Sequence, residues 1–379
     1  MSATARIKAR ALELGFAAVG VARIEPPGAD GAPASAGAPA SGTTDTGQAQ
    51  PPESPPTSTT PDIARFEAWL DAGRHAGMDW IASERSRARR SDATRLLEGA
   101  RSMVCVAICH EPGRDAERDA RLGRVARYAA GEDYHRVMRD LLRALEREIL
   151  AALPGARTLW YSDTGALLER AWAARAGLGW IGKHAGLISP TLGSYLLLGE
   201  ILVDRDLEPD PPLPREHCGT CTRCLEACPT GAIVAPHEVD ARLCISYLTI
   251  EHRGPIEPGL RRPMGDWVFG CDVCQEVCPW NRFAPPAGEA RLAGRPLQDW
   301  SLARLLELDE EGFRALFETS PIRRARRAGL LRNACVALGN RGDRSAVPAL
   351  ERARDHDPDP VVREHAAWAL ERIAEKTGR

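Results

Sequence analysis

Several common cofactor and membrane signals are missing from the sequence. No G-x-G-x-x-G follows an expected strand and no G-x-x-x-x-G-K-[ST] occurs, which argues against a dinucleotide site of the usual kind and against a P-loop. No apolar run reaches the length of about 20 residues that a membrane-spanning helix requires. We therefore expect neither a dinucleotide cofactor nor a membrane partner.

The N-terminus also lacks a secretory signal. Met1 to Gly15 is a charged amphipathic stretch without an apolar core, so we expect a cytoplasmic protein without disulfides. The chain has 379 residues, of which 44% are hydrophobic and 27% charged, and this composition predicts a globular protein of two or three domains. The net charge of −2 is unevenly distributed, because residues 322–379 carry 13 Lys and Arg against 8 Asp and Glu. If the protein binds a polyanion, we therefore expect a local basic surface to make the contact and not the protein as a whole.

Eight of the eleven cysteines lie between Cys218 and Pro279 and predict an iron–sulfur cassette. The first run reads C-G-T-C-T-R-C-L-E-A-C-P, and a second run repeats its C-x-x-C-x-x-x-C-P ending. In bacterial ferredoxins three cysteines of such a run hold one [4Fe-4S] cluster, and the fourth reaches a second cluster. The predicted ligands are Cys218, Cys221, Cys224 and Cys278 for cluster 1, and Cys228, Cys244, Cys271 and Cys274 for cluster 2.

Zinc and disulfides are the alternative explanations of these cysteines. C-x-x-C pairs also occur in zinc sites, but three cysteines at two-residue spacing followed by x-x-x-C-P are typical of iron–sulfur proteins. Disulfides would need an oxidising compartment. The other three cysteines lie in apolar runs and are expected to be buried; they are Cys105, Cys109 and Cys335.

The residues before the cassette mix strand and helix patterns without a regular alternation, which predicts an α+β fold rather than a doubly wound sheet. Pro26 to Pro61 is rich in Pro, Ala, Gly, Ser and Thr and predicts a disordered insertion. Two apolar runs, Ala185 to Ser189 and Ser194 to Val203, flank S-P-T-L-G and suggest a hairpin. The expected domains are residues 1–212 with the insertion at 26–61, a ferredoxin-like domain over 213–290, and a helical tail over 291–379.

The helical tail contains one short pattern that occurs twice. Ala334, Ala337 and Leu338 recur 32 residues later as the A-x-x-A-L of residues 366–370, with a D-P-D-P turn between them. This pattern predicts HEAT-like paired helices. An ordinary helical tail is the alternative, because two units are few for a repeat.

Four further motifs share their order and spacing with a known family. They are R-Y-A-A-G-E-D-Y-H (127–135), D-T-G-A-L-L-E-R-A-W-A-A-R-A-G-L-G-W-I-G-K-H (163–184), L-G-E-I-L-V-D (198–204) and C-I-S-Y-L-T-I-E (244–251). With the cassette and the tail, they make the chain resemble the epoxyqueuosine reductases, which are cobalamin-dependent iron–sulfur enzymes of tRNA modification. The insertion at 26–61 departs from that family.

The resemblance implies a base-off cobalamin between the N-terminal and cluster domains, reduced through two [4Fe-4S] clusters by an external electron donor. The substrate would be an epoxide on the wobble base of a tRNA anticodon stem-loop, converted to queuosine in the last step of its biosynthesis. This deoxygenation takes two electrons and two protons and releases water. The resemblance also favours a monomer.

The resemblance assigns proton donation to Asp163, whereas the sequence alone favours an N-cap of the helix that follows it. To donate a proton near neutral pH, Asp163 would need a pKa raised by burial under the corrin. Further residues in the shared motifs are candidates for the cobalamin or anticodon pocket, and they are Tyr128, His135, Trp180, Lys183 and Ser246. For Trp180, packing in the core is an equally good alternative to a pocket role, and for Lys183 so is a position in a solvated turn.

A basic helix at the start of the tail is the expected contact for tRNA phosphates. Its arginines are Arg323, Arg324, Arg326, Arg327 and Arg332, and the basic segment from Arg85 to Arg95 is the second choice. Two other functions remain open at this point. One is a different corrinoid iron–sulfur enzyme such as a reductive dehalogenase, and the other is a non-enzymatic electron carrier with a HEAT scaffold.

Overall fold

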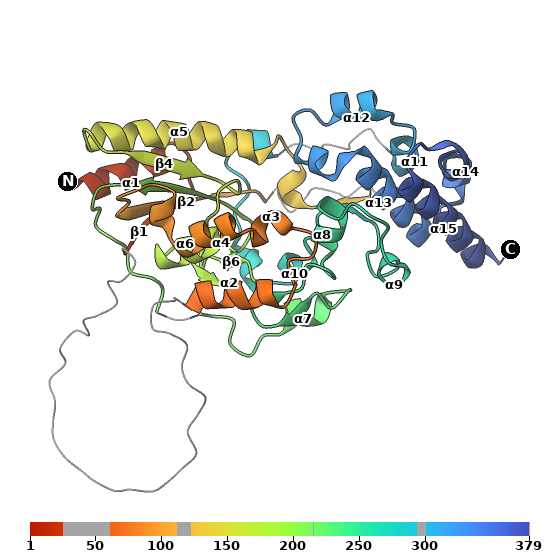
Figure 1. Cartoon of the computed structure of the whole chain (residues 1–379), viewed down its shortest axis with the longest axis horizontal. Helices are drawn as coiled ribbons and strands as arrows, with labels where there is room; N and C mark the ends of the chain where they lie inside the picture. Colours follow the sequence, from red (N-terminus) through yellow and green to blue (C-terminus); the bar gives the residue numbers. More distant parts are fainter. Residues whose placement is uncertain (26–60, 112–122, 215, 294–300, 379) are drawn as a thin grey trace, which may run out of the picture.

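The structure is a computed structural model, and it describes residues 1–25, 61–111, 123–214, 216–293 and 301–378. The N-terminus and the C-terminal helix lie at opposite ends of the molecule (Figure 1). The predicted insertion at 26–61 lies outside the described residues except for Pro61, which begins helix α2. No helix within the described ranges combines the length and the apolar character that a membrane crossing requires.

A four-stranded antiparallel sheet forms the centre of the N-terminal part. In pairing order its strands are β1 (Ala18–Arg23), β2 (Ser102–Cys109), β7 (Leu196–Val203) and β4 (Thr158–Tyr161). Every residue of β2 is buried, because this strand is paired along both edges and covered on both faces. Helices mixed with an antiparallel sheet agree with the predicted fold class.

Helices cover both faces of this sheet (Figure 1). The first face is covered by α1 (Ala3–Glu13) and α5 (Tyr134–Ala152), and the second by α6 (Glu169–Arg175). Three more helices, α2 (Pro61–Asp71), α3 (Asp79–Ala82) and α4 (Glu84–Ser91), lie on the same side of the sheet as α6. Side chains of a strand alternate between the faces, so Val106 of β2 packs with α5 and its neighbour Cys105 packs with α6. Gly20 lets β1 approach the end of α6, because a Cβ there would lie 2.0 Å from the Ala176 carbonyl oxygen.

The predicted hairpin between residues 185–189 and 194–203 is confirmed only at its turn, where Ser189 and Gly193 form an isolated antiparallel bridge. Beyond the turn the two runs do not pair, because the first run contains β6 (Leu187–Ile188), which pairs with β5 (Trp180–Ile181). The second run is β7, whose two edges are occupied by β2 and β4. A local sequence pattern cannot reveal that distant strands take both edges.

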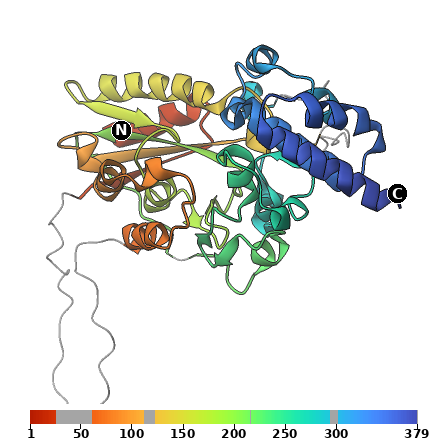
Figure 2. The ribbon, with the colours of Figure 1, turned by 45° about the vertical axis from the view of Figure 1, so that its right-hand side comes forward.

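The cassette is built from short elements and lies below the tail helices in Figure 2. Its elements are α7 (Arg223–Ala227), β8 (Ile233–Ala235), β9 (Glu238–Val239), α8 (Ile245–Ile250), α9 (Pro258–Arg261), β10 (Trp267–Phe269) and α10 (Val273–Glu276). Strand β10 pairs in parallel with β3 (Arg124–Val125), so the cassette and the N-terminal part share a small sheet.

The tail is helical, and its last helix packs along two others. Its elements are α11 (Leu302–Leu305), α12 (Glu310–Leu316), the 3-10 helix η6 (Pro321–Ala325), α13 (Arg326–Arg341), α14 (Val347–His356) and α15 (Pro360–Thr377). The repeat positions Ala334 and Ala366 are fully buried in one core. Gly339 allows α13 and α15 to pack closely, because a Cβ there would lie 2.9 Å from Ala369 Cα.

A buried arginine joins the tail to the cassette. Arg332 is 1% exposed, and its guanidinium donates to the carbonyls of Leu248 (2.5 Å), His252 (2.9 Å) and Gly254 (2.8 Å). These carbonyls lie at the C-terminal end of α8 and just beyond it, where a positive charge is favourable. The predicted phosphate contact of Arg332 is therefore wrong, because its guanidinium is buried and donates to carbonyls inside the protein.

We predict that Arg332→Met lowers the free energy of unfolding by about 3–5 kcal/mol, because three buried carbonyls lose their donor at a cost of about 1–3 kcal/mol each. Chemical denaturation followed by circular dichroism measures this change. The matched control is Arg323→Met, at an exposed arginine of η6, which should change stability by less than about 0.5 kcal/mol. Equal losses in the two variants would refute the anchoring role of Arg332.

Candidate functional site

The eight cysteines of the cassette gather in two groups. The first group contains Cys218, Cys221, Cys224 and Cys278, and the second contains Cys228, Cys244, Cys271 and Cys274. Burial raises the pKa of Cys224, and the nearby thiols of Cys218 and Cys278 add to this effect. In the same way, burial raises the pKa of Cys271, with additions from Cys244 and Cys228. The structure thus brings together the members of each predicted set, and their role as cluster ligands stays a prediction.

Two short helices exchange the fourth cysteine between the groups. Helix α7 includes Cys224, the third cysteine, and leads to Cys228, which joins the second group. Helix α10 includes Cys274 and leads to Cys278, which joins the first group. The two helices pack against each other, so the exchange occurs over the length of one helical turn on each side.

Lys183 and Trp180 lie at the loop of the first cysteine group. The Lys183 ammonium donates to the carbonyls of Gly219 (2.6 Å) and Cys221 (3.1 Å). The Trp180 ring is 5% exposed and lies edge-on to Trp280, with a centroid separation of 5.0 Å. Both side chains therefore support the loop that holds the first group.

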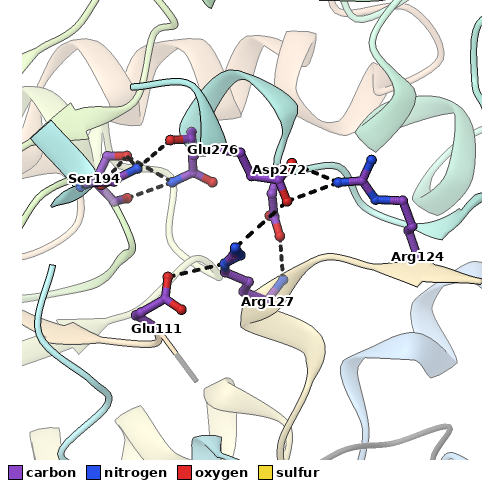
Figure 3. Close-up of polar contacts among 8 residues, drawn as sticks. Glu111, Arg124, Arg127, Ser194, Asp272 and Glu276 are labelled. Atoms are coloured by element: carbon purple, nitrogen blue, oxygen red, sulfur yellow. Dashed lines mark hydrogen bonds and ion pairs between the residues drawn. The ribbon is translucent and has the colours of Figure 1, made fainter. Parts of the chain in front are cut away.

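A polar network fastens α10 to the N-terminal part (Figure 3). Asp272 is 1% exposed and accepts the backbone amide of Arg127 at 2.8 Å. Glu276 accepts two hydrogen bonds from Arg124, at 3.0 and 2.7 Å, and Arg127 also donates to Glu111 at 3.2 Å. Asp272, the N-cap of α10, and Glu276, its last residue, both lie between Cys271 and Cys278 in the sequence. The network therefore fixes these cysteines relative to the R-Y-A-A-G-E-D-Y-H motif.

Asp163 lies in a strained turn and not at a helix N-cap. Its φ is +58°, and the amide of Thr164 donates to the carbonyl of Ser162 at 2.8 Å. Such a bond around a residue of positive φ defines the rare, strained form of γ-turn. Helix α6 begins only at Glu169, so the predicted N-cap role is wrong. Strained backbone of this kind persists where neighbouring groups hold it, and it concentrates at functional sites.

Two side chains from the start of α5 hold the Asp163 carboxylate. Tyr134 Oη donates to Asp163 Oδ2 at 2.5 Å, and His135 Nε2 lies 3.6 Å from the same oxygen. The other ring nitrogen of His135, Nδ1, lies 2.7 Å from Asp133 Oδ1. Both nitrogens of His135 thus face carboxylates.

The neighbours of Asp163 and His135 decide which of the two carries a proton. Burial alone would raise the pKa of Asp163, but the nearby His135 ring and the hydrogen bond from Tyr134 lower it below its ordinary value. These two neighbours outweigh burial, because the Asp163 side chain is 60% exposed. Burial also opposes charge on His135, yet Asp133 and Asp163 raise the pKa of His135 to about 9. At neutral pH the proton resides on His135, contrary to the expectation of a raised pKa at Asp163.

Tyr128 connects the Asp163 group to the second cysteine group. Its ring lies edge-on to Tyr134, with centroids 5.7 Å apart, and 6.1 Å from the ring of Phe269, two residues before Cys271. Ser246 lies on α8, which begins directly after Cys244. Of the five predicted pocket residues, Tyr128 and His135 therefore lie by the Asp163 group, Ser246 lies at the second cysteine group, and the other two lie at the first.

Two acidic residues next to Asp163 were missed by the sequence analysis. Glu169 Oε1 accepts the backbone amide of Asp163 at 2.5 Å, and Glu200 on β7 is fully buried. A signal for Glu200 was available, because an ionisable residue inside the apolar strand L-L-L-G-E-I-L-V is rarely buried without a partner or a function.

The tail arginines divide into internal and exposed ones. Arg327 is 8% exposed and pairs with Asp357 at 2.6 and 3.2 Å, so its predicted phosphate contact is wrong, as for Arg332. The exposed ones are Arg323, Arg324 and Arg326. A hydrogen bond to Glu251 raises the pKa of Arg324, and the charge of Asp163 adds to it, which places Arg324 within electrostatic reach of the site. In the alternative basic segment, Arg90 is 9% exposed and equally internal.

Three family models match parts of the chain. The 4Fe-4S double cluster binding domain matches residues 217–281, epoxyqueuosine reductase QueG matches residues 90–164, and HEAT repeats match residues 322–377. The first match contains all eight cysteines of the cassette and supports the prediction of two iron–sulfur clusters. The third supports the HEAT-like interpretation of the tail.

Whole-chain comparisons agree with these matches. The epoxyqueuosine reductase of Xanthomonas campestris is 44% identical over 316 residues, covering 82% of this chain and 88% of that protein. An epoxyqueuosine reductase crystallised with an epoxyqueuosine-modified tRNA-Tyr stem loop shares 30% identity at a TM-score of 0.82, covering 98% and 90% of the two chains. The Bacillus subtilis enzyme, in a structure whose catalytic loop is swung out of the active site, shares 29% identity at a TM-score of 0.81, covering 97% and 89%. The chain belongs to the epoxyqueuosine reductase family.

Proposed function

We propose that the protein reduces epoxyqueuosine to queuosine at the wobble position of a tRNA anticodon. The observation that carries this proposal is the Asp163 carboxylate, which lies in a strained turn beside a charged His135. A similar enzyme of the same fold was crystallised with an epoxyqueuosine-modified stem loop. The reaction adds two electrons and two protons to the epoxide, forms a carbon–carbon double bond and releases the oxygen as water.

The two cysteine groups are the proposed ligands of the two [4Fe-4S] clusters. Cluster 1 would be held by Cys218, Cys221, Cys224 and Cys278, and cluster 2 by Cys228, Cys244, Cys271 and Cys274. The grouping of the thiols and the match to a double-cluster family support this assignment. When bound, the clusters would supply one-electron transfer from an external donor. Tyr128, which packs between Phe269 and Tyr134, connects the second group to Asp163.

A cobalamin is the proposed cofactor between Asp163 and the cassette. Four buried ring nitrogens lack a hydrogen-bond partner among the described residues, namely His75 Nδ1, His110 Nδ1, Trp180 Nε1 and His184 Nε2. Of these, His110 lies against the ring of Tyr128, which is one of the proposed cofactor contacts. Buried polar atoms are normally satisfied, and the amide-rich periphery of a corrin offers such partners. When bound, the cobalt would supply the reducing chemistry that protein side chains lack. Tyr128, His135 and Ser246 are the proposed contacts, whereas Trp180 and Lys183 are assigned to the loop of cluster 1.

His135 and Asp163 form the proposed proton path. The imidazolium of His135 would pass its proton through the Asp163 carboxylate to the epoxide oxygen, and Asp133 would keep the ring charged. The turn around Asp163 is proposed to move, as the catalytic loop does in the similar enzyme from Bacillus subtilis. Arg323 and Arg324 would meet the phosphates of the anticodon stem.

We predict that the protein reconstituted without oxygen holds about eight irons and eight acid-labile sulfides, the content of two [4Fe-4S] clusters. Cys244→Ala should lose cluster 2 preferentially, whereas the matched variant Cys105→Ala, at a buried cysteine outside the cassette, should keep the full iron content. Iron and sulfide analysis measures both. Stoichiometric zinc in anaerobically prepared protein would contradict the proposal.

Cluster- and cobalamin-loaded protein should convert epoxyqueuosine in an anticodon stem loop to queuosine, detected by mass spectrometry. Asp163→Asn should keep both cofactors and lower the single-turnover rate by about 10²-fold or more, the range of a lost proton donor. The wild-type rate should fall as pH rises through about 9, where His135 loses its proton. The control is Asp206→Asn, at an exposed carboxylate. Absence of turnover in the loaded wild type would contradict the function, and loss of corrin in Asp163→Asn would contradict the proton-donor role.

Arg323→Ala should weaken stem-loop binding and reduce the slope of log affinity against log salt by about 0.7 to 0.9, the contribution of one phosphate contact. Fluorescence anisotropy at several salt concentrations measures this slope. Arg344→Ala, at an exposed arginine beyond the other end of α13, is the control and should leave the slope unchanged. An unaltered slope in Arg323→Ala would exclude that phosphate contact.

A further inference from the structure

Behind Asp163 lie two carboxyl groups that the proposed reaction does not use. Glu169 is the first residue of α6, and its Oε1 accepts the Asp163 amide at 2.5 Å. Glu200 lies on β7, opposite Cys105 of β2 and Tyr161 of β4, and it is 0% exposed. A carboxyl group in this position is surrounded by the apolar layer between the sheet and α6.

No donor among the described residues reaches either carboxyl oxygen of Glu200. The carboxyl of Glu169 lies beside it, within hydrogen-bonding reach. Two ionised carboxylates are both acceptors and repel each other, so this contact is stable only when one of them carries a proton. Glu200 is the one that keeps it, because it is fully buried, whereas Glu169 is partly exposed and already accepts the Asp163 amide.

The electrostatics of the pair agree with this assignment. Burial raises the pKa of Glu200 well above its ordinary range, and the charge of Glu169 adds to it. Burial also raises the pKa of Glu169 to about 7, with an addition from Asp163, while hydrogen bonds from the Asp163 amide and Glu200 lower it. Arg170 of α6 and Arg90 of α4 face the pair and interact with Glu169 and Asp163, and Cys105 faces Glu200.

We propose that Glu169 is the positioning residue that holds Asp163 in its strained turn, and that a protonated Glu200 fixes Glu169 by donating a hydrogen bond to it. This inference rests on the proposed function, in which Asp163 transfers the proton. An ionised acceptor binds an amide more strongly than a neutral one does. Glu169 thus supplies the external support that the positive φ of Asp163 requires.

The proposal has a defined dependence on pH. Glu169 becomes ionised as pH rises through about 7, so the turn is held above this pH and released below it. Removal of the Glu200 donor takes away a hydrogen bond that favours the ionised form of Glu169, so the pKa of Glu169 rises. The turn around Asp163 is then released over a range that extends to higher pH.

The test compares Glu200→Leu, which removes the donor, with Glu200→Gln, which keeps an N–H donor at the same place. Hydrogen exchange of residues 162–168 in cluster- and cobalamin-loaded protein, without tRNA, reports on the Asp163 amide. At pH 7, Glu200→Leu should exchange about 10-fold faster than the wild type and turn over a bound stem loop about 5- to 50-fold more slowly, because a hydrogen bond to a charged group shifts a pKa by about one to two units. Both differences should shrink toward pH 9, and stem-loop affinity should not change.

Glu200→Gln should stay within about threefold of the wild type in both measurements. The proposal is overturned by equal losses in the two variants at every pH, or by unchanged exchange in Glu200→Leu. A folding failure of Glu200→Leu would also count against it, because an apolar side chain in place of a buried carboxyl should not lower stability.

A third variant tests the charge of Glu169. Glu169→Gln keeps an acceptor oxygen, so exchange at Asp163, corrected for its intrinsic rate, should lose its dependence on pH near 7. A persistent dependence would overturn the proposal. If the loaded wild type does not convert epoxyqueuosine, the proposed function fails, and the exchange measurements still decide whether Glu169 and Glu200 hold the turn.

Discussion

The hydrogen bond from Tyr134 to Asp163 joins the two layers of helices that cover the sheet. Asp163 follows the edge strand β4, so it lies where both layers end. Tyr134 and His135 begin α5 on one face, and Glu169 begins α6 on the other. The starts of both helices therefore meet at Asp163: α5 supplies the groups beside its carboxylate, and α6 supplies the acceptor of its amide. The hydrogen bond from Tyr134 and the two carboxylates that face the His135 ring explain why the proton resides on His135 and not on Asp163.

The cassette is held to this site from two sides. On one side, the carboxylates of α10 bind Arg124 and Arg127, close to the start of α5. On the other, Arg332 and Asn333 of α13 bind backbone carbonyls of α8 and β10. Neither attachment is made by surface charges, since Asp272 and Arg332 are each 1% exposed. The position of the cysteine groups relative to Asp163 is thus set by buried hydrogen bonds, which are stronger and more specific than exposed ion pairs.

The sequence predicted those parts of the fold and the site that depend on local spacing. The cysteine runs, the strand within residues 194–203 and the paired helices of the tail follow from short patterns, and the structure contains all three. What could not be predicted depends on partners far along the chain. The pKa of Asp163 follows from Tyr134 and His135, nearly 30 residues earlier. Arg327 and Arg332 look like surface charges until Asp357 and the carbonyls of α8 enclose them.

The exchange of the fourth cysteine between the groups has a consequence for biosynthesis. With the ligands as proposed, neither cluster can be completed from one run alone, because α7 and α10 each carry a cysteine to the opposite group. Cluster 1 must wait for Cys278, which leaves the ribosome some 60 residues after Cys218. Both clusters therefore need ligands from both runs, so neither can be complete until the second run has been synthesised and has folded against the first.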